Sequence, residues 1–151
     1  MRIFAVDPGN ELSAWCELSD GVLQDCGKEP NVVLLKRLRE MPASATLAVE
    51  MIASYGMPVG REVFETCLWI GRFIEAWERG GGRYTLVYRR DVKLFHCESV
   101  RATDANIRAA LIDRYGPGKE KAIGTKKTPG PLYGLKGDEW SALAVALAVA
   151  R

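Results

Sequence analysis

The stretch RIFAVDPGNELSAWCEL, residues 2–18, has the pattern of two β-strands joined by a tight turn, and it decides how the chain folds. The first run is rich in β-branched and aromatic residues and ends in Asp7, which is followed at once by the turn-forming pair Pro8-Gly9. An acid at the tip of a buried strand is unfavourable unless a positive charge lies against it. Asp7 is therefore either a turn residue or one part of a charged site.

Patterns along the rest of the chain predict a single α/β domain covering residues 1–151. The hairpin signal Asp20-Gly21 separates the second and third strands, at 13–19 and 21–27. The remaining expected elements are a helix at 31–41, a strand at 46–53, a helix at 60–82, a strand at 83–89, a helix at 103–116, a mobile loop rich in Gly, Pro and Lys at 117–137 and a helix at 138–150. This order predicts a mixed sheet rather than a simple alternation of strand and helix.

Three acids occupy comparable positions in these elements. Asp7 ends the first strand, Glu50 lies alone in the apolar run TLAVEMIA, and Asp138 opens the last helix. If the first and fourth strands are neighbours, two of the side chains lie side by side, and the last helix can bring in the third. Crowded carboxylates repel one another at neutral pH unless a divalent cation neutralises them, and oxygen ligands suit Mg²⁺ or Mn²⁺. Taken singly, Asp7 in a turn and Asp138 as a helix N-cap are ordinary features.

Charge is unevenly distributed, although the net charge is only +2. Residues 83–136 contain twelve Lys and Arg against five Asp and Glu, whereas the rest of the chain contains nine against fourteen. A basic half of this kind indicates either a surface that faces a polyanion or a solvated charged face. The four cysteines lack metal-ligand spacing and no apolar run is long enough to cross a bilayer, so we expect a soluble cytoplasmic protein without membrane contact.

Three motifs together resemble the RuvC family of Holliday junction resolvases: VDPG on the first strand, AVEM on the fourth and DEWSALAVALA on the last helix. The order and types of elements match over essentially the whole chain. The resemblance implies an RNase H-like α/β fold, in which a three-stranded antiparallel meander and two parallel strands form a five-stranded mixed sheet flanked by helices. It also implies a homodimer that binds branched DNA and nicks four-way junctions as a Mg²⁺-dependent endonuclease, with Mn²⁺ as an alternative ion.

The resemblance gives the three acids a catalytic role, in which Asp7, Glu50 and Asp138 hold two Mg²⁺ ions. The family usually carries a further carboxylate one turn into the last helix, where this chain has Ser141. Glu139 is the candidate replacement as a metal ligand, although it points roughly 100° away from Asp138 around a regular helix.

The DNA-binding residues are expected around these acids. Tyr55, a few positions after the strand acid, would stack on a base, or else it only anchors its own loop. Five basic residues are expected to neutralise backbone phosphates, and they are Arg89, Arg90, Lys93, Lys126 and Lys127. The last two are equally interpretable as solvated loop charges.

Two alternative functions remain open on the sequence. One is a different RNase H-like nuclease, acting on RNA–DNA hybrids or replication forks. The other is a catalytically weak junction-binding protein, because Ser141 replaces the usual carboxylate. An actin-like ATPase also begins with an acid-bearing strand and a hairpin, but the chain is too short for its two lobes.

Overall fold

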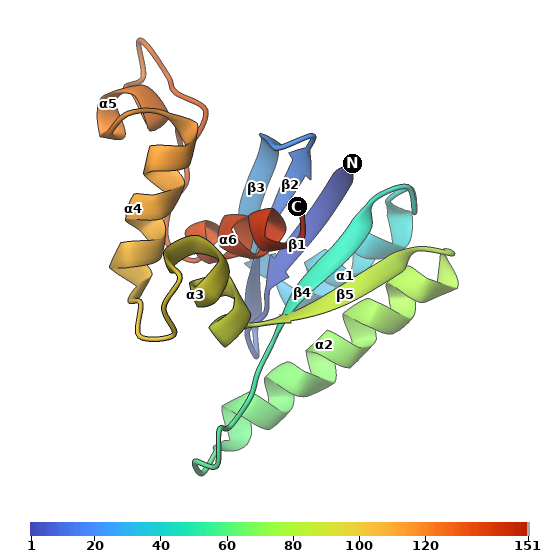
Figure 1. The fold of residues 1–151 in the computed structure, drawn as a ribbon. Coiled ribbons are helices and arrows are strands. Elements are labelled where there is room, and N and C mark those ends of the chain that lie inside the picture. The colour runs from blue at the N-terminus through green and yellow to red at the C-terminus, as the bar shows by residue number, and fades with distance from the viewer. Residues whose placement is uncertain (151) are drawn as a thin grey trace.

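A computed structural model describes residues 1–150 and contains one five-stranded mixed sheet with helices on both faces (Figure 1). The strands are β1 (Arg2–Asp7), β2 (Leu12–Ser19), β3 (Val22–Pro30), β4 (Thr46–Met51) and β5 (Arg83–Tyr88), and they lie in the order β3-β2-β1-β4-β5. The first three strands are antiparallel, whereas β4 and β5 run parallel to β1. This topology confirms the predicted fold class, an antiparallel meander extended by two parallel strands.

Side-chain alternation along β1 divides the core into two halves. Ile3 and Ala5 face one side of the sheet, and Phe4 and Val6 face the other, each at most 1% exposed. Because β1 is the central strand and is covered on both faces, its sequence is continuously apolar until Asp7.

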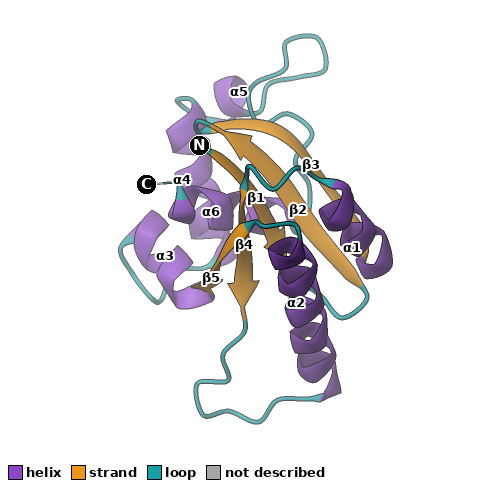
Figure 2. Ribbon diagram, turned by 90° about the vertical axis from the view of Figure 1, so that its right-hand side faces the viewer, coloured by secondary structure: helices purple, strands orange, loops and turns teal. Residues whose placement is uncertain are grey.

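The helices α1 (Asn31–Glu40) and α2 (Arg61–Arg79) cover the face to which Phe4 belongs (Figure 2). The buried side of α2 includes Phe73 and Trp77, and the indole Nε1 of Trp77 donates to the carbonyl of Arg83 at 2.9 Å. A side chain at Gly82 would place its Cβ 2.2 Å from that Nε1, so the chain needs glycine where it turns from α2 into β5. The contact fixes the start of β5 against the end of α2.

The opposite face of the sheet is covered by α6 (Glu139–Val149), with α3 (Arg89–Cys97) and α4 (Asp104–Tyr115) packed against it. Every residue of α6 from Ala142 to Ala148 is buried, because the helix lies between the strands and the two other helices (Figure 1). The ring Nε2 of His96 in α3 lies 2.8 Å from the carbonyl oxygen of Ala144, which joins α3 to the middle of α6.

The structure corrects the expected elements in several places, and among these β3 continues to Pro30 and α2 ends at Arg79. β4 ends at Met51 rather than at residue 53, and the strand expected at 83–89 ends at Tyr88, where α3 begins. The sequence does not predict α3, because the helix is only nine residues long, follows β5 without a turn signal and has Val92 as its only buried residue. The segment 117–137 is not only a loop. It contains the short helix α5 (Lys119–Ala122), and it is anchored by buried Leu132.

Within residues 1–150, none of the helices has both the length and the apolar character needed to span a bilayer.

Candidate active site

One row of side chains crosses the sheet at the end of β1, where α6 begins. Asp7 in β1 pairs with Ala14 in β2, and Ala14 pairs with Lys28 in β3. On the other side, the parallel register of β1 and β4 brings Glu50 next to Asp7. Residues directly opposite one another project from the same face of a sheet, which here is the face that α6 covers. The register therefore places two acids and one lysine against the start of α6.

Asp7 is in an environment that disfavours its charge. Burial, and then the negative charges of Glu50 and Asp138, raise the pKa of Asp7 from 3.8 to about 7, while Arg89 and Lys28 act in the opposite direction. The three acids that the sequence singled out are thus close enough to affect one another's protonation. A cation bound among them would restore the charged form of each.

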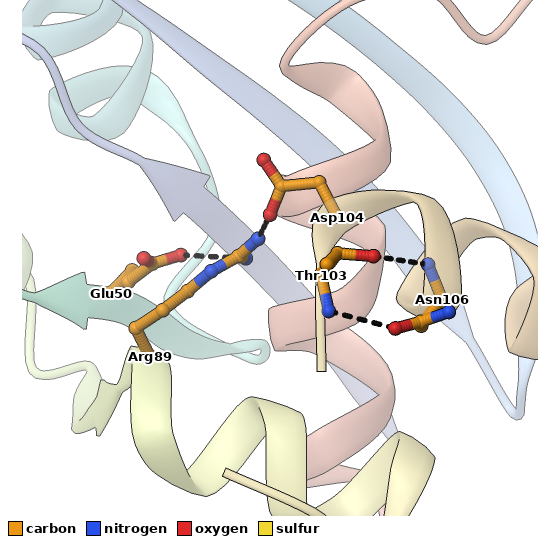
Figure 3. A network of polar contacts seen from close by, with 5 residues as sticks. All are labelled: Glu50, Arg89, Thr103, Asp104 and Asn106. Carbon is orange, nitrogen blue, oxygen red and sulfur yellow. Dashed lines mark hydrogen bonds and ion pairs between the residues drawn. The ribbon is translucent and has the colours of Figure 1, made fainter. Parts of the chain in front are cut away.

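Glu50 faces a single guanidinium. Burial raises its pKa, and Arg89, whose Nη1 lies 3.9 Å from Oε2 of Glu50, opposes that shift. Arg89 also forms an ion pair with Asp104 of α4, so its guanidinium lies between two carboxylates from different elements (Figure 3). Thr103 and Asn106 form a capping box that fixes the start of α4 beside this contact. Oε2 of Glu50 is nevertheless buried without a hydrogen bond among the residues that the structure describes.

Asp138 stands immediately before α6, but its side chain does not cap the helix. Instead, its Oδ2 accepts a hydrogen bond from Nζ of Lys28 at 2.7 Å. Both side chains are about half exposed, and the contact with Asp138 raises the pKa of Lys28. The N-cap interpretation of Asp138 therefore lacks its characteristic hydrogen bond, and the side chain is turned toward the row of charged residues.

The structure places Glu139 differently from the other acids. Glu139 is 3% exposed, and its Oε1 accepts hydrogen bonds from Sγ of Cys26 at 3.2 Å and from the backbone N–H of Lys136 at 3.4 Å. It is thus bound to β3 and to the loop before α6, and it does not join Asp7 and Glu50. Ser141, one turn further along α6, lines a cavity of about 320 Å³ that also contains Asp138.

The donor set fits a hard divalent cation, because Asp7, Glu50 and Asp138 supply carboxylate oxygens only. Oε2 of Glu50, which lacks a hydrogen bond, and the raised pKa of Asp7 are further features that a bound cation would satisfy. The cage is not preformed. Over residues 1–150, no three His, Cys, Asp or Glu side chains are near enough together to hold an ion.

The aromatic residue and three of the basic residues expected to bind DNA share one hollow. It measures about 380 Å³ and is lined by Tyr55, Arg89, Arg90, Lys93 and Val100. Tyr55 is 60% exposed and holds a left-handed backbone conformation (φ +50°) in the loop between β4 and α2. Among these lining residues, only Arg89 forms ion pairs with carboxylates.

Lys126 and Lys127 lie away from this hollow. They are exposed at the tip of a turn in which Gly124 and Pro129 form an isolated β-bridge and Thr125 and Thr128 bond to each other. This turn follows α5, and the segment projects from the body of the molecule at the far end of α4 (Figure 1). The structure therefore does not bring these two lysines next to Asp138, in spite of their closeness in sequence.

Solved structures of RuvC share this architecture. The Thermus thermophilus RuvC structure matches with a TM-score of 0.66 over 99% of this chain and 93% of that one, at 16% sequence identity. T. thermophilus RuvC in complex with Holliday junction substrate matches with a TM-score of 0.62 over 99% and 92% of the two chains, at 17% identity. The chain has the RuvC fold. In sequence, no family model and no curated protein matches it.

Two charged residues of this candidate site were not selected from the sequence, namely Lys28 and Asp104. Alternation along β3 puts Lys28 on the same face as Cys26, but its distance from the acids depends on a β2–β3 register that shifts between Glu17 and Leu18. Asp104 has the usual place of an acid in the first turn of a helix. Its contact with Arg89 arises only when α3 and α4 pack together.

Proposed function

We propose that this protein is a metal-dependent endonuclease that nicks four-way DNA junctions. The observation that carries the proposal is the position of Asp7, Glu50 and Asp138 at the carboxyl ends of β1 and β4 and the start of α6, where burial and the charges of neighbouring acids raise the pKa of the first two. A structural protein gains nothing from two like charges in a poorly solvated place, and perturbed acids of this kind cluster at functional sites.

Asp7, Glu50 and Asp138 are the residues that would hold Mg²⁺ or Mn²⁺. When bound, such an ion supplies a water of lowered pKa and stabilises the charge that develops on the leaving oxygen. Asp7 and Glu50 come from paired neighbouring strands, so their carboxylates are held by the most rigid part of the fold. Arg89 orients Glu50 and is itself held by Asp104. Its proposed role is therefore to position Glu50 as well as to face a phosphate.

The hollow beside the acids supports contact with an opened junction. Tyr55 offers an exposed ring for stacking, and Arg90 and Lys93 on α3 offer charges for the adjacent phosphates. Lys126 and Lys127 lie on the projecting turn, where they would reach a more distant part of the same DNA. Contacts of this kind position the substrate without reading its sequence.

A homodimer would supply two such sites related by a two-fold axis, which symmetric nicking of a junction requires. The outer side of α2 supports this arrangement. Phe64 and Leu68, one turn apart, are 62% and 70% exposed, and a Cβ added at the exposed Gly71 meets no atom within 4 Å. A second copy of α2 would remove this apolar surface from water.

A second candidate function is junction binding with weak cleavage. The observation that favours it is the hydrogen bond between Lys28 and Asp138, together with Ser141 in place of a carboxylate. Both features reduce the negative charge available to a metal ion.

Incubation with a synthetic four-way junction, a linear duplex and an RNA–DNA hybrid, each in Mg²⁺, Mn²⁺ or EDTA, separates these functions. We expect paired symmetric nicks in the junction alone, abolished by EDTA. The substitutions Asp7→Asn, Glu50→Gln and Asp138→Asn should abolish the nicks and retain junction binding. Asp113→Asn, which alters an exposed acid of α4, is the matched control.

Each other outcome has a definite meaning. Binding without nicks in any ion would support the binding protein, and cleavage of the hybrid would support a different nuclease. Cleavage by Asp7→Asn at the parent rate would overturn the assignment of the site.

A further inference from the structure

Lys28 is a cation that the fold brings into the group of acids from a strand at the edge of the sheet. β3 is separated from β1 by β2, so the backbones at Lys28 and Asp7 are about 10 Å apart. The residue between them in the row is Ala14, which is 1% exposed and has only a methyl group on this face. No bulky side chain therefore stands between the flexible stem of Lys28 and the acids.

The ammonium group of Lys28 contacts Asp138, which is the only one of the three candidate metal ligands outside the sheet. Its Nζ lies 2.7 Å from Oδ2 of Asp138, at the start of α6. Lys28 also interacts electrostatically with Asp7 and with Glu139. One positive charge is thus shared among acids from β1 and α6, as a bound metal ion would be.

A metal ion and this ammonium compete for the same oxygen. A carboxylate oxygen that accepts a short hydrogen bond from Lys28 is a weaker ligand for a divalent cation, since the two positive charges repel each other. Asp138 is also the acid with the most freedom to change partner, because it precedes α6 and is about half exposed.

We propose that Lys28 is a tethered counter-ion of the candidate metal site, which holds Asp138 in the metal-free protein and is displaced when a divalent cation binds. The inference rests on the proposed function, since it takes Asp7, Glu50 and Asp138 as the metal ligands. In this arrangement Lys28 controls the affinity of the site for the metal ion. Once displaced, Lys28 lies beside the ion, where the phosphate backbone of DNA is to bind.

Lys28→Met tests this proposal because it keeps the length of the stem and removes the charge. At pH 7.5 and without DNA, calorimetric titration with Mg²⁺ and Mn²⁺ should show affinity about 1.5- to 5-fold tighter than in the parent, the range that a half-exposed ion pair supports. The rise in melting temperature on adding metal should increase accordingly. Lys28→Arg keeps the charge and should bind metal much as the parent does.

The control is Lys36→Met, which removes a lysine that also faces a carboxylate, Glu40 at 4.0 Å, but on the exposed side of α1. Its metal affinity should equal that of the parent. If Lys28→Met binds metal no more tightly than the parent, the role of Lys28 is overturned and the proposed nuclease stands. If the parent, Lys28→Met and Lys28→Arg all fail to bind Mg²⁺ and Mn²⁺, the metal site itself is overturned, and the proposed function with it.

Discussion

Asp7 has two possible roles, as a ligand in a metal site or as a residue of a turn. Its neighbours in sequence, Pro8 and Gly9, are typical of a turn, and a Cβ at Gly9 would lie 2.3 Å from the carbonyl oxygen of Leu12. Its neighbours in space are Glu50 and Asp138, and they repel its charge. The two interpretations predict opposite effects on stability.

We expect Asp7→Asn to stabilise the metal-free protein at pH 8. The folded-state pKa of about 7 lies above the unfolded value of 3.8, so the folded protein binds more protons between them, and the stability of the parent falls as pH rises through this window. Asn lacks this penalty, so the free energy of unfolding should rise by up to about 4 kcal/mol above pH 7 and stay nearly unchanged near pH 4. Urea unfolding in EDTA at both pH values measures the difference. A loss of about 0.5–2 kcal/mol at both would instead identify a turn residue.

Ser141→Asp restores a carboxylate at the position where the family usually has one. Ser141 lines the same cavity as Asp138, so the added charge would lie at the edge of the metal site and strengthen its attraction for cations. We expect the Mg²⁺-dependent nicking rate to be preserved or increased, with half-maximal rate at a lower Mg²⁺ concentration. Ser44→Asp, in the loop before β4, is the control and should leave the metal dependence unchanged. A higher Mg²⁺ requirement in Ser141→Asp would contradict the assignment.

At the scale of elements, the turn after β1 is held by α1 through a buried polar network. Ser13 accepts a hydrogen bond from the N–H of Gly9 at 3.1 Å and donates to Oδ1 of Asn31 at 2.6 Å. Nδ2 of Asn31 donates to the carbonyl of Gly9 at 2.8 Å. Ser13 and Asn31 are at most 1% exposed, and through their bonds to the partly buried Gly9 they tie the turn beside Asp7 to the first residue of α1.

We expect Asn31→Ala to reduce the free energy of unfolding by about 1–3 kcal/mol, because it removes the acceptor of the buried Ser13 hydroxyl proton and the donor to the partly buried carbonyl of Gly9. Urea unfolding monitored by circular dichroism gives the value. Val32→Ala, at the next and exposed position of α1, should cost far less. Equal losses in the two variants would show that the network contributes nothing beyond the helix itself.

The loop between β4 and α2 makes a separate prediction about substrate. Tyr55 is 60% exposed, so Tyr55→Ala should leave the melting temperature nearly unchanged. Loss of base stacking, worth about 1–3 kcal/mol, should lower junction cleavage by about 5- to 150-fold. A thermal melt and a cleavage time course test both points. A large fall in melting temperature would indicate that the ring only anchors its loop.

At the scale of the whole molecule, the exposed side of α2 is the surface that we propose for a second copy of the chain. Leu68→Glu places a charge in the middle of this side and should convert a dimer into a monomer, since a buried unpaired charge opposes association. Light scattering at micromolar concentration measures the mass, and the paired nicks in a junction should become single nicks. Val33→Glu on the exposed side of α1 is the control. A parent that is monomeric both with and without junction DNA would contradict the dimer.

Local patterns in the sequence were enough to predict the five strands and most helices, with Asp7 at the end of the first strand, Glu50 within the fourth and Asp138 at the start of the last helix. These features depend on side-chain periodicity and turn residues, which are properties of short segments. The same patterns did not reveal α3, whose contacts are made with α4, α6 and β5 rather than within its own turns.

Tertiary structure alone decided which charges meet. The strand register placed Lys28 in line with Asp7, and the packing of α3 on α4 placed Arg89 between Glu50 and Asp104. The sequence also offered Glu139 as a metal ligand, whereas the orientation of α6 turned it toward Cys26. Contacts between segments far apart in the chain depend on register and helix orientation, and these are set by packing of the whole core rather than by any local run of residues.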